Sequence, residues 1–175
     1  MKKQDILENQ VNIVYLSLGS NLGNKKKNLE ISKSLLISND INIIKTSSIY
    51  KSNSWPNKNF PDYLNIVLLV NTKLKLLELF DKVKFIEKLM GRTIRKRNYP
   101  RICDIDIIDF NGKSLITKKM NDKIIVPHER MHERNFVLLP LYEINKKWIH
   151  PKFKKNIVKL ISNLPIIDLR SIKFI

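Results

Sequence analysis

The chain is poor in cysteine, poor in acidic residues and free of long apolar runs. Its single cysteine, Cys103, excludes an internal disulfide, favours a reducing compartment and is expected to be a small buried apolar side chain. No stretch approaches the roughly 20 uncharged apolar residues that a membrane-spanning helix needs. The start of the chain, MKKQDILENQ, is charged and lacks the apolar run of a signal peptide. These absences predict a cytoplasmic protein with no membrane partner.

The shortage of acidic residues leaves a strong positive charge. The chain has 33 lysines and arginines against 16 aspartates and glutamates, a formal net charge of +17. A polyanionic partner would explain this charge, but lysine spread over a solvated surface explains the total better. Residues 91–101, GRTIRKRNYPR, are different because four of them are arginine. The planar guanidinium matches phosphate oxygens bidentately, so this segment is a candidate phosphate site.

Hydrophobic patterning predicts one domain of the α+β class in these 175 residues. One helix is expected over 24–37 with Asn24 as its N-cap, and a second from Leu76 to Met90, ending at Gly91. Short apolar runs predict strands at 12–18, 41–50, 64–70 and 102–110. The order β-α-β-β-α-β is that of a ferredoxin-like sandwich, with helices packed on a mostly antiparallel sheet.

Further patterns concern the second half of the chain. Asn111-Gly112, directly after the last of these strands, is a strong hairpin signal. A helix is expected after Pro127 toward Tyr142, with an interruption at Pro140. Apolar residues at helical spacing indicate another helix near the end, at Phe153, Ile157, Leu160 and Ile161.

The segment VPHERMHERNF (126–136) contains the string H-E-x-x-H. On a helix this string would place His128 and His132 around a zinc ion, with a glutamate as general base. The continuation typical of metzincins is absent, Pro140 would cut the helix short, and Glu143 is poorly spaced as a third ligand. We therefore expect this string to serve another purpose.

Two carboxylates alternate with isoleucines in the strand over 102–110. Asp104 and Asp106 are two residues apart, so they point to one face of the strand, about 6.6 Å apart along it. Two such oxygen ligands on a rigid element suit Mg²⁺. The alternative is a pair that faces solvent or binds neighbouring arginines. Arg101 lies three residues before Asp104, so anion-binding and cation-binding groups converge, as phosphoryl-type transfer requires.

Two loops could contribute to a site. GSNLGN (19–24) is neither a dinucleotide-binding fingerprint nor a P-loop, and turn geometry alone explains it. The loop over 52–65 contains Trp55, Phe60 and Tyr63, with Asn65 at the start of a strand. Ordinary packing explains these residues, but rings with an amide would also suit a flat heterocycle.

Together these stretches resemble the 6-hydroxymethyl-7,8-dihydropterin pyrophosphokinase family of folate biosynthesis. The resemblance covers roughly residues 12–145 of a single domain, 1–175, leaving a polar extension at 1–11 and a divergent part at 146–175. The most specific element is P-R-x-x-D-x-D-I, residues 100–107. The other matching blocks are YLSLGSNLGN, SSIYKS, FPDYLN, GR, and VPHERMHERNFVLLPLYEI. The resemblance implies a ferredoxin-like fold and transfer of pyrophosphate from ATP to the pterin hydroxymethyl group, releasing AMP.

The resemblance also implies a role for each matching residue. Asp104 and Asp106 would bind two Mg²⁺ ions between ATP and the substrate hydroxyl, while Arg92 and Arg101 would neutralise the transferred phosphates. Tyr63 would sandwich the pterin together with Phe136. The implied contacts to the pterin edge and its amino-pyrimidine part are Asn65, Ser52 and Trp55. The residues implied on the ATP side are Glu87, Arg95, Ile107, His128 and Arg134.

Three positions depart from the family pattern. Tyr99 stands where a small residue usually precedes the P-R pair, which puts the shape of the catalytic loop in question. Ile94 stands where a second loop arginine is common, and the neighbouring Arg95 would have to replace it. Asn53 replaces a proline of the pterin loop. None of these departures removes an implied metal ligand.

A nucleic-acid-binding module of the same fold is the competing function. RNA binders of this type stack bases on aromatic residues of their strands. Here the central strands are aliphatic, and the carboxylates of Asp104 and Asp106 would repel a phosphate backbone. An inactive relic that acts as a structural partner is a weaker alternative. The expected partners are therefore the dihydropterin and ATP, with no nucleic acid, bound by a monomer or a weak dimer.

Overall fold

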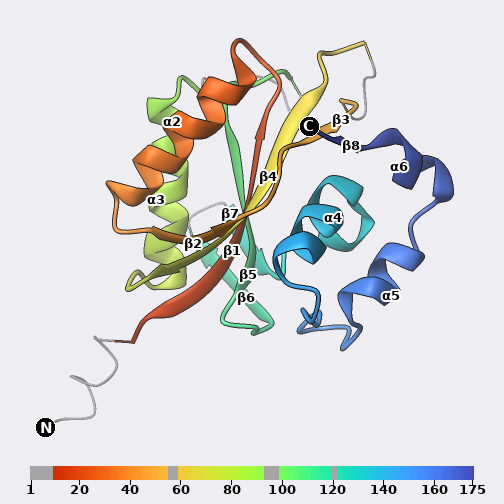
Figure 1. Ribbon diagram of the computed structural model, residues 1–175. Coiled ribbons are helices and arrows are strands. Elements are labelled where there is room, and N and C mark those ends of the chain that lie inside the picture. The colour runs from red at the N-terminus through yellow and green to blue at the C-terminus, as the bar shows by residue number, and fades with distance from the viewer. Residues whose placement is uncertain (1–9, 55–58, 93–98, 120–121) are drawn as a thin grey trace, which may run out of the picture.

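The computed structural model describes residues 10–54, 59–92, 99–119 and 122–175. Trp55, Ile94 and Arg95 lie outside these ranges. The fold is a mixed α/β arrangement in which helices cover both faces of an antiparallel sheet (Figure 1). Within the described ranges, no helix is long and apolar enough to cross a membrane.

The main sheet has the strand order β5-β1-β4-β3-β8, and β2 pairs with β4 beside β3. All of its pairings are antiparallel. Its strands are β1 (Asn12–Ser20), β2 (Asn42–Thr46), β3 (Tyr50–Ser52), β4 (Tyr63–Thr72), β5 (Asp104–Phe110) and β8 (Lys173–Phe174). A separate two-stranded sheet consists of β6 (Leu115–Lys119) and β7 (Asp122–Val126).

Helices α2 (Lys25–Ile37) and α3 (Leu76–Leu89) cover one face of the main sheet (Figure 1). As expected, Asn24 caps α2, because its side chain accepts a hydrogen bond from the Lys27 amide at 3.1 Å. Gly91 follows α3 with a φ of +87°, a conformation that favours glycine. The core on this face includes Leu16, Leu18, Leu29, Leu68, Ile86, Ile105 and Ile107.

Cys103 lies in the same core, directly before β5. Its side chain is 2% exposed, and its Sγ lies 3.1 Å from Ser32 Oγ on α2. Burial raises the pKa of the Cys103 thiol to about 12. The cysteine is therefore the small buried residue that the sequence predicts.

On the opposite face α4 (Asn135–Ile144) packs against the sheet and α5 (Ile157–Ser162) packs against α4, and α6 (Ile166–Ser171) follows farther out (Figure 1). Successive strand residues point to opposite faces, so Tyr15 lies on this side while Leu16 lies on the other. The second core comprises Tyr15, Val67, Ile108, Met131, Val137, Leu138, Leu141, Trp148, Ile157, Leu160 and Leu164.

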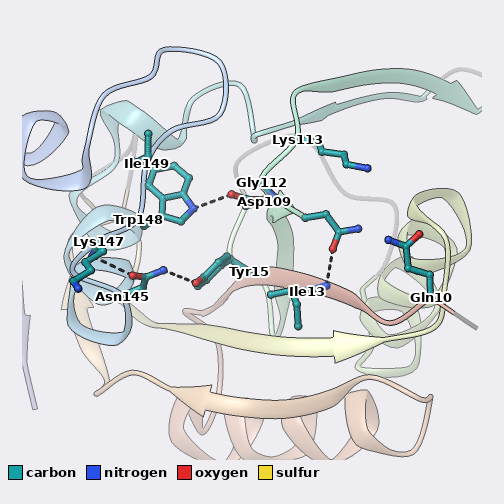
Figure 2. Close-up of a pocket in the computed structure, with 11 residues that line it drawn as sticks. Gln10, Ile13, Tyr15, Asp109, Gly112, Lys113, Asn145, Lys147, Trp148 and Ile149 are labelled. Atoms are coloured by element: carbon teal, nitrogen blue, oxygen red, sulfur yellow. Dashed lines mark hydrogen bonds between the residues drawn. The ribbon is translucent and has the colours of Figure 1, made fainter.

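Figure 2 shows the hydrogen bonds that join the end of α4 and the segment after it to the sheet. Trp148 Nε1 donates to Asp109 Oδ2 at 2.8 Å, and Asn145 Nδ2 donates to the Tyr15 hydroxyl at 2.8 Å. Burial raises the pKa of Asp109, and the hydrogen bond from Trp148 opposes that shift. These residues line a cavity of about 580 Å³ whose buried polar groups bind one another.

The predicted strand over 41–50 is wrong in one respect, because it consists of two short strands, β2 and β3. Ser47 lies at the break between them. Its amide donates to Val67 O at 3.0 Å and its Oγ accepts from Val67 N at 2.9 Å. The serine side chain therefore replaces a backbone acceptor of the ladder, and the strand bends there.

The predicted hairpin after β5 is also wrong, although the turn itself forms. Asn111 and Gly112 have φ values of +56° and +62°. The Ile13 amide donates to Asn111 Oδ1 at 2.8 Å, and the Asn111 amide donates to Ile13 O at 2.8 Å. These bonds hold the turn against β1, and β6 pairs with β7 instead of β5.

The helix expected from Pro127 begins later, at Asn135, after a single turn of 3-10 helix at Met131–Glu133. It does not break at Pro140, the sixth residue of α4. An internal proline costs roughly 3 kcal/mol. Burial of Val137, Leu138 and Leu141 on the same helix offsets this, because each side chain contributes about 2 kcal/mol.

The C-terminal helix is shorter than predicted, since α5 begins at Ile157, after Phe153. Helix α6 and strand β8 were not predicted. Both are very short, and β8 is defined only by its pairing with β3, which no local pattern encodes.

His150 gives the fold a defined sensitivity to acid. Its ring is 3% exposed, stacks on Phe153 at 4.3 Å, and its Nδ1 accepts from the amides of Lys152 and Phe153 at 3.2 Å. Burial lowers the pKa of His150 from 6.5 to about 4, and the nearby charges of His132 and Lys152 act in the same sense.

We predict that stability falls as the pH drops from about 6.5 to about 4, because the unfolded chain binds a proton there and the folded chain does not. The loss is on the order of 2 kcal/mol. His150→Asn keeps an acceptor for the two amides but cannot be protonated. Urea unfolding across this pH range should therefore give a flatter stability curve for the variant. Parallel curves for the two proteins would contradict the assignment.

Candidate active site

The predicted site residues meet across three neighbouring strands. In the sheet register, Gly19 on β1 pairs with Asn65 on β4 and with Asp104 on β5. Ser17, two residues earlier, pairs with Asp106. Directly paired residues point to the same face of a sheet. Asn65, Asp104 and Asp106 therefore share one face, as the spacing of the carboxylates predicts.

Gly19 provides the space between these side chains. A Cβ at this position would lie 3.1 Å from Asn65 Oδ1 and 3.4 Å from Tyr63 Cδ1. The glycine therefore lets Tyr63 and Asn65 lie close over β1, next to the carboxylates. The sequence pattern alone assigns this glycine to a turn. Its role depends on its pairing with Asn65 on β4, which lies 46 residues later in the sequence. The local sequence therefore gives no signal for it.

Asp104 is bound by two arginines. Its Oδ1 lies 2.9 Å from Arg92 Nη1 and 2.8 Å from Arg101 Nη1. Burial alone would raise the pKa of Asp104, but the charges of Arg101 and Arg92 outweigh it and lower the pKa below its usual value. The carboxylate is therefore ionised at neutral pH. The arginine-rich segment and the strand carboxylate form one cluster in the folded chain.

Glu87 lies beneath this cluster on α3. Its side chain is 1% exposed and forms an ion pair with Arg92. Glu87 Oε1 accepts from the Ile105 amide at 2.8 Å, and Oε2 lies 2.9 Å from Lys84 Nζ. Burial raises the pKa of Glu87, and Lys84 is the main opposing charge. Glu87 therefore joins α3 to β5 and supports Arg92 from below.

Asp106 has a separate set of partners. Its Oδ2 lies 2.9 Å from Arg134 Nη1 and 3.8 Å from His128 Nε2. His128 Nδ1 accepts from the Arg130 amide at 3.2 Å, which fixes the orientation of the ring. Burial lowers the pKa of His128, although the charge of Asp106 opposes that shift. His128 is therefore neutral near pH 7.

The residues predicted for a heterocycle lie beside the carboxylates. Asn65 Nδ2 donates to Ser52 Oγ at 2.9 Å and to Tyr50 O at 3.3 Å. Burial raises the pKa of Tyr63, and the nearby Arg101 acts in the opposite sense, which places the phenol next to the arginine cluster. Phe136 approaches from α4, with its ring 5.7 Å from the Arg134 guanidinium carbon.

The string H-E-x-x-H does not lie on one helix. His128 precedes the 3-10 helix and faces Asp106, as described above. His132 lies within that helix and packs edge-on against Phe153, with ring centroids 5.0 Å apart. The two imidazoles therefore point to different neighbours. In the described ranges, no three His, Cys, Asp or Glu side chains are grouped as a metal site.

The comparison with known proteins identifies the family. The sequence model of the 7,8-dihydro-6-hydroxymethylpterin-pyrophosphokinase (HPPK) family matches residues 15–146. The 2-amino-4-hydroxy-6-hydroxymethyldihydropteridine pyrophosphokinase of Bacillus subtilis is 38% identical over 134 residues, which are 76% of this chain and 78% of that protein. The chain belongs to the HPPK family.

Some matching proteins are much longer than this chain. The folic acid synthesis protein FOL1 of Dictyostelium discoideum is 40% identical over 154 residues, which are 88% of this chain but 23% of that protein. The chain thus spans about a quarter of its length. Plasmodium falciparum HPPK-DHPS aligns with 90% of this chain and 42% of its own, with a TM-score of 0.72. At 18% identity, that likeness shows a shared fold.

The departures from the HPPK pattern have different structural settings. The Tyr99 ring lies 5.6 Å from the Phe60 ring, so the tyrosine joins the segment before Arg101 to the loop before β4. Asn53 is exposed. Ile94 lies outside the described ranges, as does Arg95, so its predicted replacement by Arg95 stays a prediction. The side chain of Ile107 lies in the core against α2 and α3, and its predicted place on the ATP side also stays a prediction.

Asn21 is a site residue that the sequence analysis missed. It is 1% exposed and connects three segments of the candidate site. Asn21 Oδ1 accepts from the Arg101 amide at 2.8 Å, and Nδ2 donates to Pro61 O at 3.2 Å. The Asn21 amide donates in turn to Arg101 O at 3.1 Å. The only sequence signal was its place in the GSNLGN block.

We predict that Asn21→Ala lowers the free energy of unfolding by about 2 kcal/mol, because the Arg101 amide loses its buried acceptor. Asn53→Ala is the matched control, because Asn53 is exposed and its loss should be close to zero. Urea unfolding of both variants measures the difference. Equal stability of the two variants would show that the bond to Arg101 contributes nothing.

Proposed function

We propose that this chain transfers pyrophosphate from ATP to the hydroxymethyl group of 6-hydroxymethyl-7,8-dihydropterin, giving AMP and the pterin pyrophosphate. The observation that supports this proposal is the row Asn65–Gly19–Asp104, in which a side-chain amide lies beside an arginine-bound carboxylate. Membership of the HPPK family supports the same reaction, as do relatives named for this pyrophosphokinase activity. The proposed place in metabolism is folate biosynthesis.

The two aspartates fit divalent cations. Each uses one oxygen for arginine, Oδ1 in Asp104 and Oδ2 in Asp106. Among the described residues the second oxygen of each carboxylate has no ion-pair partner, so it is left for a cation. Mg²⁺ prefers such carboxylates together with phosphate oxygens. We infer that Asp104 and Asp106 bind two Mg²⁺ ions, which would supply charge neutralisation and orientation for the phosphates.

The surrounding basic side chains bind the phosphate groups of ATP. Arg92 and Arg101 neutralise charge on the transferred phosphates, and their positions are fixed by Asp104 and by the buried Glu87. Arg134 is fixed by Asp106 in the same way and contacts the ATP phosphates. His128 is neutral and offers its Nε2 to a phosphate or ribose. Groups that are already oriented do not have to reorganise during transfer.

The other end of the site selects the pterin. We propose that the pterin binds between Tyr63, Asn65 and Ser52 on the strand side and Phe136 on α4, and we call this place the pterin slot. Tyr63 and Phe136 supply ring faces for a flat heterocycle, and the Asn65 amide hydrogen-bonds its edge. The bond from Asn65 Nδ2 to Ser52 Oγ fixes which way the amide faces.

The strand order supports a finer fold assignment. With β2 counted as the edge strand, the order β5-β1-β4-β2 and the antiparallel pairings are those expected of a split β-α-β arrangement. We propose that the domain is ferredoxin-like, with β3 and β8 added along the β4 edge.

We predict that Asp104→Asn and Asp106→Asn each reduce turnover by at least about 100-fold, because each removes a charge that the transferred phosphates and cations require. AMP release from ATP, Mg²⁺ and the dihydropterin measures the effect. Asp122→Asn is the matched control, since Asp122 is exposed on β7, outside the site. Both site variants should melt cooperatively, as the wild type does. Wild-type turnover in either would reject the assigned carboxylate.

A further inference from the structure

Residues 166–175, here called the strap, follow the part of the chain that the family model matches, residues 15–146. The strap comprises α6 and β8, and it runs from the helices on one face of the sheet to the edge of β3 (Figure 1). Nothing in the proposed reaction uses it directly. Its two ends nevertheless contact the elements that border the pterin slot.

One end of the strap pairs with β3, the strand that contains Ser52. Phe174 pairs with Tyr50 in the register, and the Ile175 amide donates to Ile49 O at 2.9 Å. The Phe174 ring lies 6.4 Å from the Tyr50 ring. β3 has only three residues, so this second ladder supports a strand that otherwise pairs only with β4.

The other end of the strap binds the first residue of α4. Asn135 Nδ2 donates to Asp168 O at 2.5 Å and to Ser171 Oγ at 3.4 Å. Asn135 lies between Arg134 and Phe136 in the sequence, and it is 8% exposed. The strap therefore binds the helix end that bears the Phe136 ring. The adjacent Arg134 is held separately, by Asp106 on β5.

The opposite end of α4 is joined to the strand side without the strap. Glu143 accepts from the Ser48 amide and hydroxyl at 2.9 Å, and from the Tyr50 hydroxyl at 2.9 Å. Burial raises the pKa of Tyr50 to about 12, so the phenol remains a donor. Glu143 thus fixes the C-terminal end of α4, while the strap fixes the N-terminal end.

Contact between the strap and the body of the domain is incomplete. A cavity of about 520 Å³ remains between the strap residues Leu169, Ile172 and Phe174 and the residues Tyr142 and Tyr50. Few close-packed contacts therefore reinforce the strap, so its two hydrogen-bonded ends determine where it lies.

We propose that the strap sets the width of the pterin slot, by fixing the first turn of α4 relative to β3. Asn135 and the Ile175 amide are the positioning groups. This inference rests on the proposed function, because it assigns the strap to pterin affinity and not to ATP binding or to the transfer step.

The test uses the full chain with three substitutions. Ile175→Pro removes the N–H that binds Ile49 O, and Ile175→Val is its control because it keeps that N–H. Asn135→Ala removes the link at the other end. For Ile175→Pro and Asn135→Ala we expect KM for the dihydropterin to rise about fivefold, while kcat and KM for ATP stay within about twofold. Ile175→Val should behave as the wild type.

The outcomes separate the two proposals. No AMP release by the wild type would reject the proposed function itself. Wild-type activity with an unchanged pterin KM in both Ile175→Pro and Asn135→Ala would overturn the role of the strap. That role would also be overturned if the KM values for both substrates rose together, or if the effects merely followed a lowered melting temperature. If Ile175→Pro does not fold, Asn135→Ala decides the question.

Discussion

The site depends on the ion pairs between the arginines and the carboxylate of Asp104. Like charges that lie close together repel one another, and burying a charge costs free energy because the charge loses its hydration. Asp104 resolves both problems for Arg92 and Arg101, and Glu87 adds a buried counter-charge beneath them. Lys84 forms a further ion pair with Glu87, so the cluster has 3 cations and 2 anions and keeps an excess of positive charge. This excess positive charge would attract the phosphates of the proposed reaction.

The sheet register explains how distant segments come to this cluster. β1 lies between β4 and β5, so each residue of β1 fixes the spacing of its two partners. Gly19 contributes no side chain, and Asn65 and Asp104, which we propose act on the heterocycle and in the phosphate site, meet over it. Asn21, two residues further on, binds the loops on both sides. The short segment from Gly19 to Asn21 thus organises both halves of the site.

Sequence reasoning succeeded where the governing interactions are local. The alternation of Asp104 and Asp106 with isoleucines predicted their common face, and Asn24 was identified as a cap from its place before α2. It failed where the local structure depends on contacts with residues that are distant in the sequence. The turn at Asn111 is bound to β1, so no hairpin with β6 forms, and α4 continues through Pro140 because its neighbours are buried. Roles for Gly19, Asn21 and β8 arise from pairings that no short pattern encodes. The roles of the remaining candidate residues stay predictions from the family resemblance.

The setting of Cys103 has a chemical consequence for the neighbouring strand. The residue immediately precedes Asp104, and its sulfur is enclosed between α2 and the sheet. Oxidants and alkylating reagents attack the thiolate, which a thiol with a pKa of about 12 does not form at physiological pH. Oxidants in the cell therefore meet no reactive thiolate at this position. The sulfur lies in the core on the face of the sheet opposite the two carboxylates, where burial protects it from oxidation.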